Sequence, residues 1–145
     1  MSKVTIMIGL PGSGKSTWAS QNRNNAKVCS ADLYFMRTGK YEFNAAFLGE
    51  AHKQCLRQFC QAVQDDLPVL VDNTNTSLLA LAPYMAVAAA YNCEIEVIYM
   101  DCDPETSAQR NTHGVSAATC QAMYGQLQAL RRDWPTYWPK PTIVR

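Results

Sequence analysis

The chain has 145 residues and a formal net charge of +1, and 48% of its residues are hydrophobic. The hydrophobic content excludes a mainly disordered chain, and no apolar run approaches the roughly 20 residues of a membrane-spanning helix. The near-neutral charge argues against tight non-specific binding to long nucleic acids, but not against an enzyme that binds one strand end through a few phosphates. We therefore expect one globular domain over residues 1–145, located in the cytoplasm and without a membrane partner.

The first half of the chain alternates short apolar runs with helical patterns. A β-branched apolar run at 3–9 leads directly into a glycine-rich segment, which is typical of a strand buried on both faces of a parallel sheet. We expect a helix at 15–22, a second strand at 27–30, and a long amphipathic helix at 44–66, where apolar residues recur every three or four positions. The chain therefore opens as strand, loop, helix and strand.

The second half continues the alternation. Pro68 ends the long helix, and the apolar run 69–71 predicts a third strand that stops at the turn-forming residues 72–75. The remaining pattern predicts a helix capped by Ser77 that runs to Tyr91, a strand at 94–100, a helix at 104–110, a helix at 117–132 after Ser116, and a short fifth strand at 142–144. This order predicts an α/β fold, an open parallel sheet of four to five strands with helices on both faces and ligands at the carboxyl ends of the strands.

The segment from Gly9 to Ser16 matches the phosphate-binding pattern G-x-x-x-x-G-K-S between a buried strand and a helix N-terminus. Gly12 and Gly14 allow the backbone to turn its N–H groups toward phosphate oxygens. Lys15 is placed to reach the β- and γ-phosphates, and the Ser16 hydroxyl is a ligand for Mg²⁺. The predicted nucleotide-binding residues are Gly9, Pro11, Gly12, Ser13, Gly14, Lys15, Ser16, Thr17 and, from outside the loop, Arg110. The sequence predicts a P-loop NTPase fold with ATP and Mg²⁺ as cofactors; a glycine-rich turn that binds nothing is the alternative.

Polar residues follow the second and third predicted strands. Asp32 lies just past the second strand, where it is a candidate to take the proton of a hydroxyl acceptor; capping of a turn is its alternative role. Asp72 ends the third strand, the usual place of a carboxylate that organises Mg²⁺ or a substrate hydroxyl beside a P-loop. Together with Asp72, the neighbouring Asn73, Thr74 and Asn75 are candidate substrate-binding residues.

Arg110 is the candidate for a positive charge above the P-loop. The transition state of phosphoryl transfer spreads negative charge over the phosphoryl oxygens, so a mobile arginine on a lid is expected. Arg110 ends the helix at 104–110 and precedes the short segment 111–115, which is suited to hinge a helical lid. The alternative is a surface arginine that complements a helix C-terminus, and His113 by itself is assigned a structural role.

Several of these segments together resemble the polynucleotide kinase-like branch of P-loop kinases. The branch includes the 5′-hydroxyl kinase domain of bacteriophage polynucleotide kinase and related ATP-binding domains such as that of the myelin cyclic-nucleotide phosphodiesterase. The similarity runs from Met1 to about Met123, and the segments D-N-T-N and R-N-x-H-G-V are more specific to the branch than the P-loop is. The segments that carry it are Gly9–Trp18, Ser30–Tyr34, Ala51–His52, Val71–Thr76 and Arg110–Val115.

The resemblance implies roles for two residues and exposes two departures. It implies that Asp32 is the general base for a polynucleotide 5′-hydroxyl and that Arg110 stabilises the transferring phosphate from the lid. Phe35 stands where the phage enzyme has an arginine for the substrate phosphate, and the second lid arginine of that enzyme has no counterpart here. Arg37, two residues further on, is a hypothesis for the first of these roles.

The sequence as a whole predicts an ATP-dependent kinase that transfers the γ-phosphoryl group to a hydroxyl, with the 5′-hydroxyl end of DNA or RNA as the favoured acceptor. The predicted catalytic residues are Asp32, Lys15 and Arg110, and the predicted metal ligands are Ser16 and Asp72. Two alternatives stay open. One is a small-molecule kinase for a sugar, nucleoside or antibiotic, which the near-neutral charge and the missing arginines favour; the other is a nucleotide-binding interaction module without transfer activity.

Overall fold

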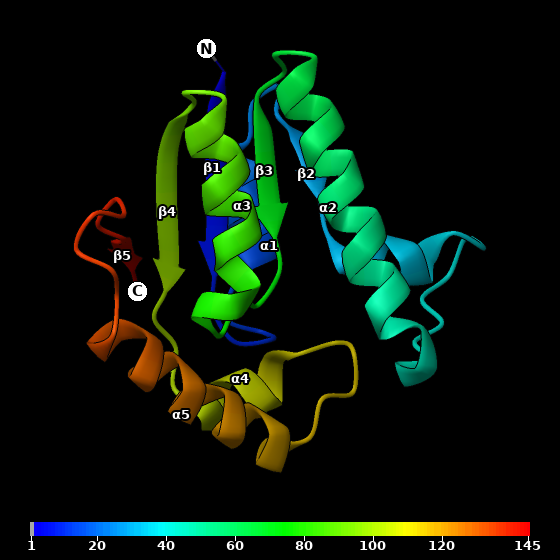
Figure 1. Cartoon of the computed structure of the whole chain (residues 1–145). Coiled ribbons are helices and arrows are strands. Elements are labelled where there is room, and N and C mark those ends of the chain that lie inside the picture. Colours follow the sequence, from blue (N-terminus) through cyan, green and yellow to red (C-terminus); the bar gives the residue numbers. More distant parts are fainter. Residues whose placement is uncertain (1) are drawn as a thin grey trace.

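The computed structural model describes residues 2–145 and shows a five-stranded sheet with helices on both faces (Figure 1). The strands lie in the order β2-β3-β1-β4-β5, and every neighbouring pair is parallel. The strands are β1 (Lys3–Ile8), β2 (Lys27–Cys29), β3 (Val69–Asp72), β4 (Glu94–Met100) and β5 (Thr142–Val144). The helices are α1 (Lys15–Asn22), α2 (Leu48–Gln64), α3 (Leu78–Ala90), α4 (Pro104–Arg110) and α5 (Ala117–Arg132), with 3₁₀ helices η1 (Ala31–Met36) and η2 (Ala45–Phe47). The predicted α/β fold with a parallel sheet is therefore confirmed.

The middle strand, β1, is apolar on both faces and contributes to two separate cores. Val4, Ile6 and Ile8 belong to the larger core and Met7 to the smaller one on the opposite face, and all four are fully buried. Side chains alternate across a strand, so a nearly continuous apolar run is what a central strand needs. The parallel register places Met7 opposite Asp72, so the chain leaves β1 and β3 at the same edge of the sheet.

The two faces of the sheet are covered unequally. Helices α2 and α3 pack on one face, where Phe59 and Leu81 are buried against the strands, and Leu127 of α5 joins the same core. Helix α1 covers the other face through Ala19 and the partly buried Trp18. Figure 1 shows α2 and α3 in front of the sheet and α1 behind it, whereas α4 and α5 lie beyond the carboxyl ends of the strands. None of the helices formed by residues 2–145 has the length and apolar character needed to cross a membrane.

Helix boundaries set by local capping agree with the sequence. The Ser77 hydroxyl accepts a hydrogen bond from the N–H of Ala80 at the start of α3, and Ser116 does the same for α5. The long helix predicted at 44–66 is shorter, because Asn44 caps the separate 3₁₀ helix η2 and α2 begins only at Leu48. The 3₁₀ helix η1 was not predicted, since a few residues of 3₁₀ structure leave no apolar period to detect.

Phe59 offers a test of how much the larger core contributes to stability. Its ring is fully buried and packs edge to face on Tyr84, with ring centroids 4.9 Å apart. Phe59→Ala should lower the free energy of unfolding by about 3–5 kcal/mol in urea denaturation, because it removes buried apolar area and leaves a cavity. Leu79→Ala is the matched control: Leu79 is 85% exposed, so the expected change is within about 0.5 kcal/mol. Similar losses of unfolding free energy in both variants would contradict the burial of Phe59 in this core.

Candidate active site

A cleft of about 1040 Å³ opens at the carboxyl ends of the strands. Its walls come from the loop after β1, from the ends of β2 and β3, and from the segment after α4. In a parallel sheet these ends share one edge, so segments far apart in the sequence meet there. The cleft brings together all five predicted catalytic and metal-binding residues, Lys15, Ser16, Asp32, Asp72 and Arg110.

The N-terminus of α1 forms one wall of the cleft. The first hydrogen bond of the helix runs from the N–H of Trp18 to the carbonyl of Gly14, at 2.9 Å. The N–H groups of Lys15, Ser16 and Thr17 therefore have no carbonyl partner within the helix and can bind an anion. Gly14 has φ +99°, a left-handed conformation that side chains rarely adopt, and this turn directs the chain into the helix.

Gly12 lets α4 approach the P-loop closely. A Cβ atom at Gly12, where φ is +77°, would lie 2.6 Å from both the amide nitrogen of Asn111 and the carbonyl oxygen of Ser107. The Ser107 hydroxyl also donates a hydrogen bond to the carbonyl of Pro11. The P-loop and the helix that carries Arg110 are therefore held against each other by direct contact.

Two predicted P-loop residues lie behind the cleft rather than along it. The N–H of Gly9 donates to the carbonyl of Thr74 at 3.1 Å, which ties the P-loop to the end of β3. The Ser13 hydroxyl is buried, and within residues 2–145 it is the one buried side-chain polar atom without a hydrogen-bond partner. A Cβ atom on Gly9 would come within 2.8 Å of this hydroxyl, so Gly9 leaves the space that Ser13 occupies.

Lys15 is held inside the loop by a neutral partner. Its ammonium group donates to the carbonyl of Leu10 at 2.8 Å, and the residue is only 9% exposed. Burial lowers the pKa of Lys15, and the nearby carboxylates of Asp72 and Asp32 oppose that shift. An ammonium group buried beside a carbonyl lacks full charge compensation, and the phosphate oxygens of a bound nucleotide would supply it.

Ser16 and Asp72 form a hydroxyl–carboxylate pair across the cleft. The Ser16 hydroxyl donates to Asp72 Oδ2 at 3.0 Å. Burial raises the pKa of Asp72, while the neighbouring Lys15 ammonium and the bond from Ser16 act in the opposite direction. Mg²⁺ prefers such oxygen ligands and is often held by one or two of them beside substrate phosphates, so the pair fits this ion.

The buried carboxyl of Asp72 predicts a pH-dependent stability in the absence of ligands. Its pKa is higher in the folded chain, so the contribution of Asp72 to stability should fall as the pH rises from 3.8, the ordinary value, through the raised pKa. Asp72→Asn keeps an acceptor for Ser16 but removes the charge. The variant should therefore be more stable than the wild type at pH 7, and the difference should vanish at acidic pH. Thermal unfolding across pH measures this; a variant that is less stable at pH 7 would contradict it.

Asp32 presents its carboxylate to the cleft from η1. The cap of η1 is the Ser30 hydroxyl, which accepts from the N–H of Asp32 at 3.2 Å, so the turn is capped without the Asp32 side chain. That side chain is 54% exposed, and its neighbours are the hydroxyl of Tyr41 at 3.5 Å and Nε2 of His113 at 3.8 Å. Burial is the main cause that raises the pKa of Tyr41, and the adjacent Asp32 carboxylate adds to it. The Tyr41 hydroxyl therefore stays protonated and can donate to Asp32.

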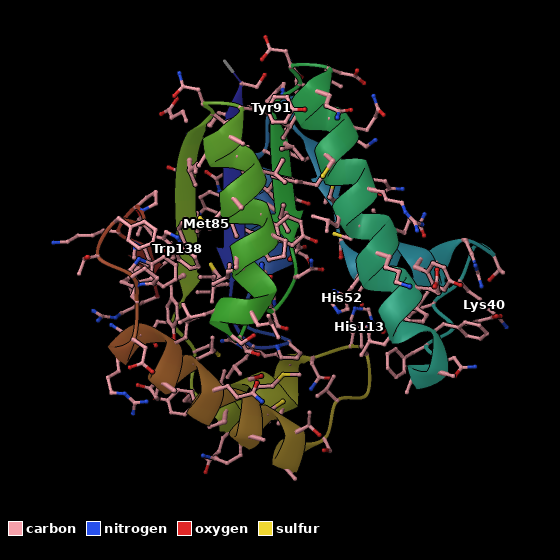
Figure 2. The ribbon with its side chains drawn as sticks, in the orientation of Figure 1. Lys40, His52, Met85, Tyr91, His113 and Trp138 are labelled. Carbon is pink, nitrogen blue, oxygen red and sulfur yellow. The ribbon has the colours of Figure 1, made fainter. Side chains whose placement is uncertain are left out.

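His113 lies in the cleft, which the sequence did not indicate. Its ring centroid is 4.1 Å from that of Tyr41, and its Nε2 faces Asp32. His113 and His52, both labelled in Figure 2, line the cleft. The contacts of His113 with Tyr41 and Asp32 join residues distant in the sequence, so no local pattern could have identified them.

The C-terminal end of α4 places Arg110 at the cleft. Arg110 is exposed, lines the cleft, and has no salt-bridge partner in the part of the chain that the structure describes. Asn111 fixes the segment next to it: its Nδ2 donates to the carbonyls of Ala108 and Val115, and its Oδ1 accepts from the N–H of Val115 at 2.8 Å. Asn111 is a second residue that the sequence did not single out, and it shapes the candidate lid.

The amides of the two candidate asparagines bond to the protein itself. Asn73 Oδ1 accepts from the N–H of Ala31 at 2.9 Å, and Asn75 Nδ2 donates to the carbonyl of Met7 at 2.7 Å. Both residues are buried, and Asn75 has a left-handed φ of 51°. These bonds join the ends of neighbouring strands. Of the residues proposed for substrate binding at this strand end, Thr74 lines the cleft together with Asp72 and Asn73.

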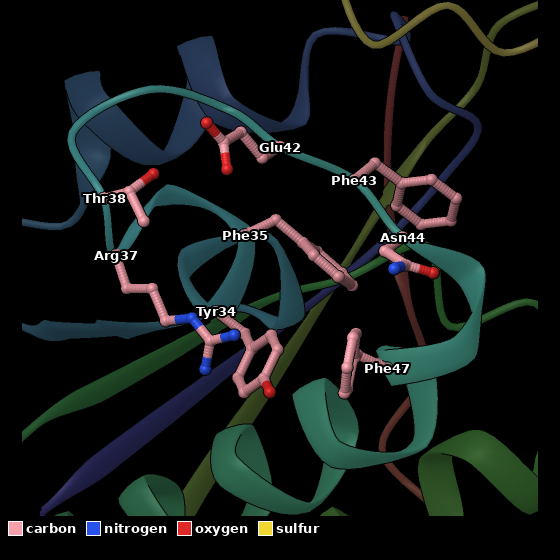
Figure 3. A pocket seen from close by; sticks show the side chains of 8 residues that line it. All are labelled: Tyr34, Phe35, Arg37, Thr38, Glu42, Phe43, Asn44 and Phe47. Atoms are coloured by element: carbon pink, nitrogen blue, oxygen red, sulfur yellow. The ribbon is translucent and has the colours of Figure 1, made fainter.

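Arg37 lies outside the cleft. Its guanidinium group sits over the ring of Tyr34, 4.0 Å from the ring centroid. Both residues line a second, smaller pocket of about 290 Å³ (Figure 3). The structure therefore separates Arg37 from the other predicted site residues and places it beside aromatic rings.

The chain is similar to several known proteins. A family profile described as an AAA domain matches residues 4–136. NEDD4-binding protein 2 of Homo sapiens is 32% identical over 123 residues, which is 78% of this chain and 7% of that protein. A candidate bifunctional polynucleotide kinase/RNA ligase of Autographa californica nuclear polyhedrosis virus is 26% identical over 122 residues, 75% of this chain and 18% of the viral protein.

The fold is also similar to a chain in the structure of the Pnkp1/Rnl/Hen1 RNA repair complex. The TM-score is 0.77 at 21% sequence identity, and the match covers 92% of this chain and 46% of that chain. This chain therefore spans less than half the length of each of these similar proteins.

Proposed function

This chain belongs to the AAA domain family, which matches residues 4–136, and from that premise we propose that it is an ATP-dependent kinase for the 5′-hydroxyl end of a nucleic acid. The proposal rests on one observation, that Lys15, Ser16, Asp32 and Arg110 line the same cleft. Two of the similar proteins bear names that refer to polynucleotide kinase or RNA repair, which supports the choice of acceptor.

The P-loop side of the cleft would hold the nucleotide and the metal. The free N–H groups at the start of α1 and the Lys15 ammonium bind phosphate oxygens. Ser16 and Asp72 hold Mg²⁺ through their oxygen atoms, which already lie 3.0 Å apart. Mg-ATP, when bound there, supplies the γ-phosphoryl group for transfer.

The opposite side of the cleft would activate the acceptor. Asp32 accepts the proton of the acceptor hydroxyl as its oxygen bonds to the γ-phosphorus and the bond to the ADP oxygen breaks. Tyr41 and His113 flank the carboxylate and orient it. Arg110 has no competing ion-pair partner within residues 2–145, and its charge stabilises the negative oxygens of the transferring group.

The acceptor is tested by incubating the protein with Mg²⁺ and γ-labelled ATP. A 5′-hydroxyl oligonucleotide should acquire the label, and the same oligonucleotide with a 5′-phosphate should not. Sugars and nucleosides form the comparison panel, because the low net charge of +1 favours a small-molecule acceptor as the second candidate. Label on small alcohols alone would establish that candidate, and nucleotide binding without transfer to any acceptor would indicate an interaction module.

A further inference from the structure

A second pocket adjoins the cleft, and aromatic side chains dominate it. The pocket has a volume of about 290 Å³ and is formed by the segment 34–47 (Figure 3). Four aromatic rings line it, those of Tyr34, Phe35, Phe43 and Phe47. Phe35 packs against Phe43 with ring centroids 5.0 Å apart, and Tyr34 lies near Phe47 at 6.4 Å. None of these rings has a role in the nucleotide site described above.

Exposed large hydrophobic residues are concentrated in the segment around this pocket. Five of the ten exposed large hydrophobic residues among residues 2–145 fall between positions 33 and 48. Phe43 is 53% exposed and Phe47 is 44% exposed. Exposed aromatic rings that line a pocket beside a cleft are typical of a binding surface, because folding alone gains nothing from leaving the rings in water.

The aromatic pocket is continuous with the catalytic side of the cleft. Phe43 lines both hollows. Its ring is nearly parallel to that of Tyr41, at 16° and with centroids 6.5 Å apart, and the Tyr41 hydroxyl reaches Asp32. A row of rings therefore leads from the carboxylate of Asp32 into the pocket, so a molecule bound at Asp32 can extend directly onto them.

The charges around the pocket suit a nucleotide strand better than a small alcohol. Arg37 contributes a positive group that stacks on the ring of Tyr34. The acidic residue of the pocket, Glu42, is paired with Lys40, whose Nζ lies 4.0 Å from Glu42 Oε1. Flat apolar rings recognise the face of a base, and an adjacent cation recognises a backbone phosphate. A sugar or a simple alcohol offers neither feature.

We propose that this pocket binds the first bases behind the 5′ end of a single-stranded acceptor, stacked on Phe43 and Phe47 with Arg37 at the backbone phosphate. The inference rests on the proposed function, in which Asp32 receives the terminal hydroxyl. It adds a substrate class, an unpaired end, because a base held inside a pocket of protein rings is withdrawn from a duplex. An end recessed within a duplex is consequently a poorer substrate.

The first test measures binding without ATP, by fluorescence anisotropy of a single-stranded 5′-hydroxyl oligonucleotide labelled at its 3′ end. Phe43→Ala should weaken binding by about 5- to 150-fold, the range expected when one base loses its stacking partner. Phe43→Trp should retain it. Tyr137→Ala is the matched control, because Tyr137 is an aromatic residue that is 85% exposed and lines neither hollow, and it should bind like the wild type.

The second test removes the bases instead of the ring. The oligonucleotide with two abasic residues at its 5′ end should bind the wild type more weakly than the intact oligonucleotide does. The same change should cost Phe43→Ala less affinity, because Phe47 is then the one proposed ring left to stack a base. Equal loss in both proteins, or unchanged binding by Phe43→Ala, would overturn the inference. Unchanged oligonucleotide binding together with lost self-association in sedimentation would assign the patch to a second copy of this chain.

The binding and transfer assays together distinguish failure of the stacking site from failure of the proposed kinase activity. Transfer of label to oligonucleotides with no dependence on Phe43 would leave the kinase proposal intact and remove the stacking site. Base-dependent binding that needs Phe43, without any transfer of label, would keep the stacking site and remove the kinase proposal. ATP-dependent thermal stabilisation of Phe43→Ala, measured in parallel, verifies that the P-loop side is folded in the variant.

Discussion

Asp32→Asn is expected to lower kcat for oligonucleotide phosphorylation by about 10²–10⁴-fold, because it removes the group that accepts the hydroxyl proton. The affinity for ATP should change little, since the neighbours of this carboxylate are Tyr41 and His113 rather than the P-loop amides. The measurements are steady-state kinetics with the oligonucleotide varied and calorimetric titration with ATP. A low kcat with an intact ATP affinity is the pattern of an interaction used in the chemical step.

The control for this variant is another exposed carboxylate far from the cleft. Asp65 lies at the end of α2, where it accepts hydrogen bonds from Gln61, and it does not line the cleft. Asp65→Asn should keep the wild-type kcat. If Asp32→Asn turned over as fast as the wild type, Asp32 would not be the general base and the kinase mechanism would have to be abandoned.

Arg110→Ala is expected to cause the second large loss, a decrease in kcat of about 10³–10⁵-fold, the range known for arginines that stabilise transferring phosphoryl groups. The guanidinium group has no salt bridge to break within residues 2–145, so its removal should leave the stability of the fold unchanged. Arg110→Lys should recover only part of the activity, because an ammonium group keeps the charge but loses the planar fork. Single-turnover kinetics with prebound ATP isolates the chemical step.

A suitable control removes a different arginine. Arg57 is exposed on α2 and does not line the cleft, so Arg57→Ala should leave the single-turnover rate unchanged. Comparable losses in both variants would show that general charge, rather than the position of Arg110 at the end of α4, supports activity. A variant at Arg110 that raised only the KM for ATP would assign this residue to nucleotide binding alone.

Direct contact between the P-loop and α4 determines where Arg110 lies. Gly12 permits contact at distances that any side chain would prevent, and Ser107 bonds to the carbonyl of Pro11. The backbone of Arg110, at the end of α4, is therefore held in a fixed position relative to the P-loop. Asn111 then shapes the next turn of the chain, so that His113 returns to the carboxylate of Asp32.

The sequence by itself determined the features that depend on neighbouring residues. The P-loop pattern, the caps at Ser77 and Ser116, and the apolar period of α2 and α5 involve groups only a few positions apart, so the local pattern is enough to read them. The strands also followed from short apolar runs, and the parallel arrangement followed from their alternation with helices. The long helix at 44–66 was the main error in length, because a 3₁₀ turn continued its apolar pattern.

Only the tertiary structure decided which distant residues meet. The strand order brings the ends of β1, β2 and β3 to one edge, and this places Asp32 and Asp72 in the same cleft as Lys15. The contact of His113 with Asp32 and the position of Arg37 in a separate aromatic pocket depend on how whole helices and loops pack on the sheet. Such packing is decided by burial summed over many residues, so no short stretch of sequence encodes it.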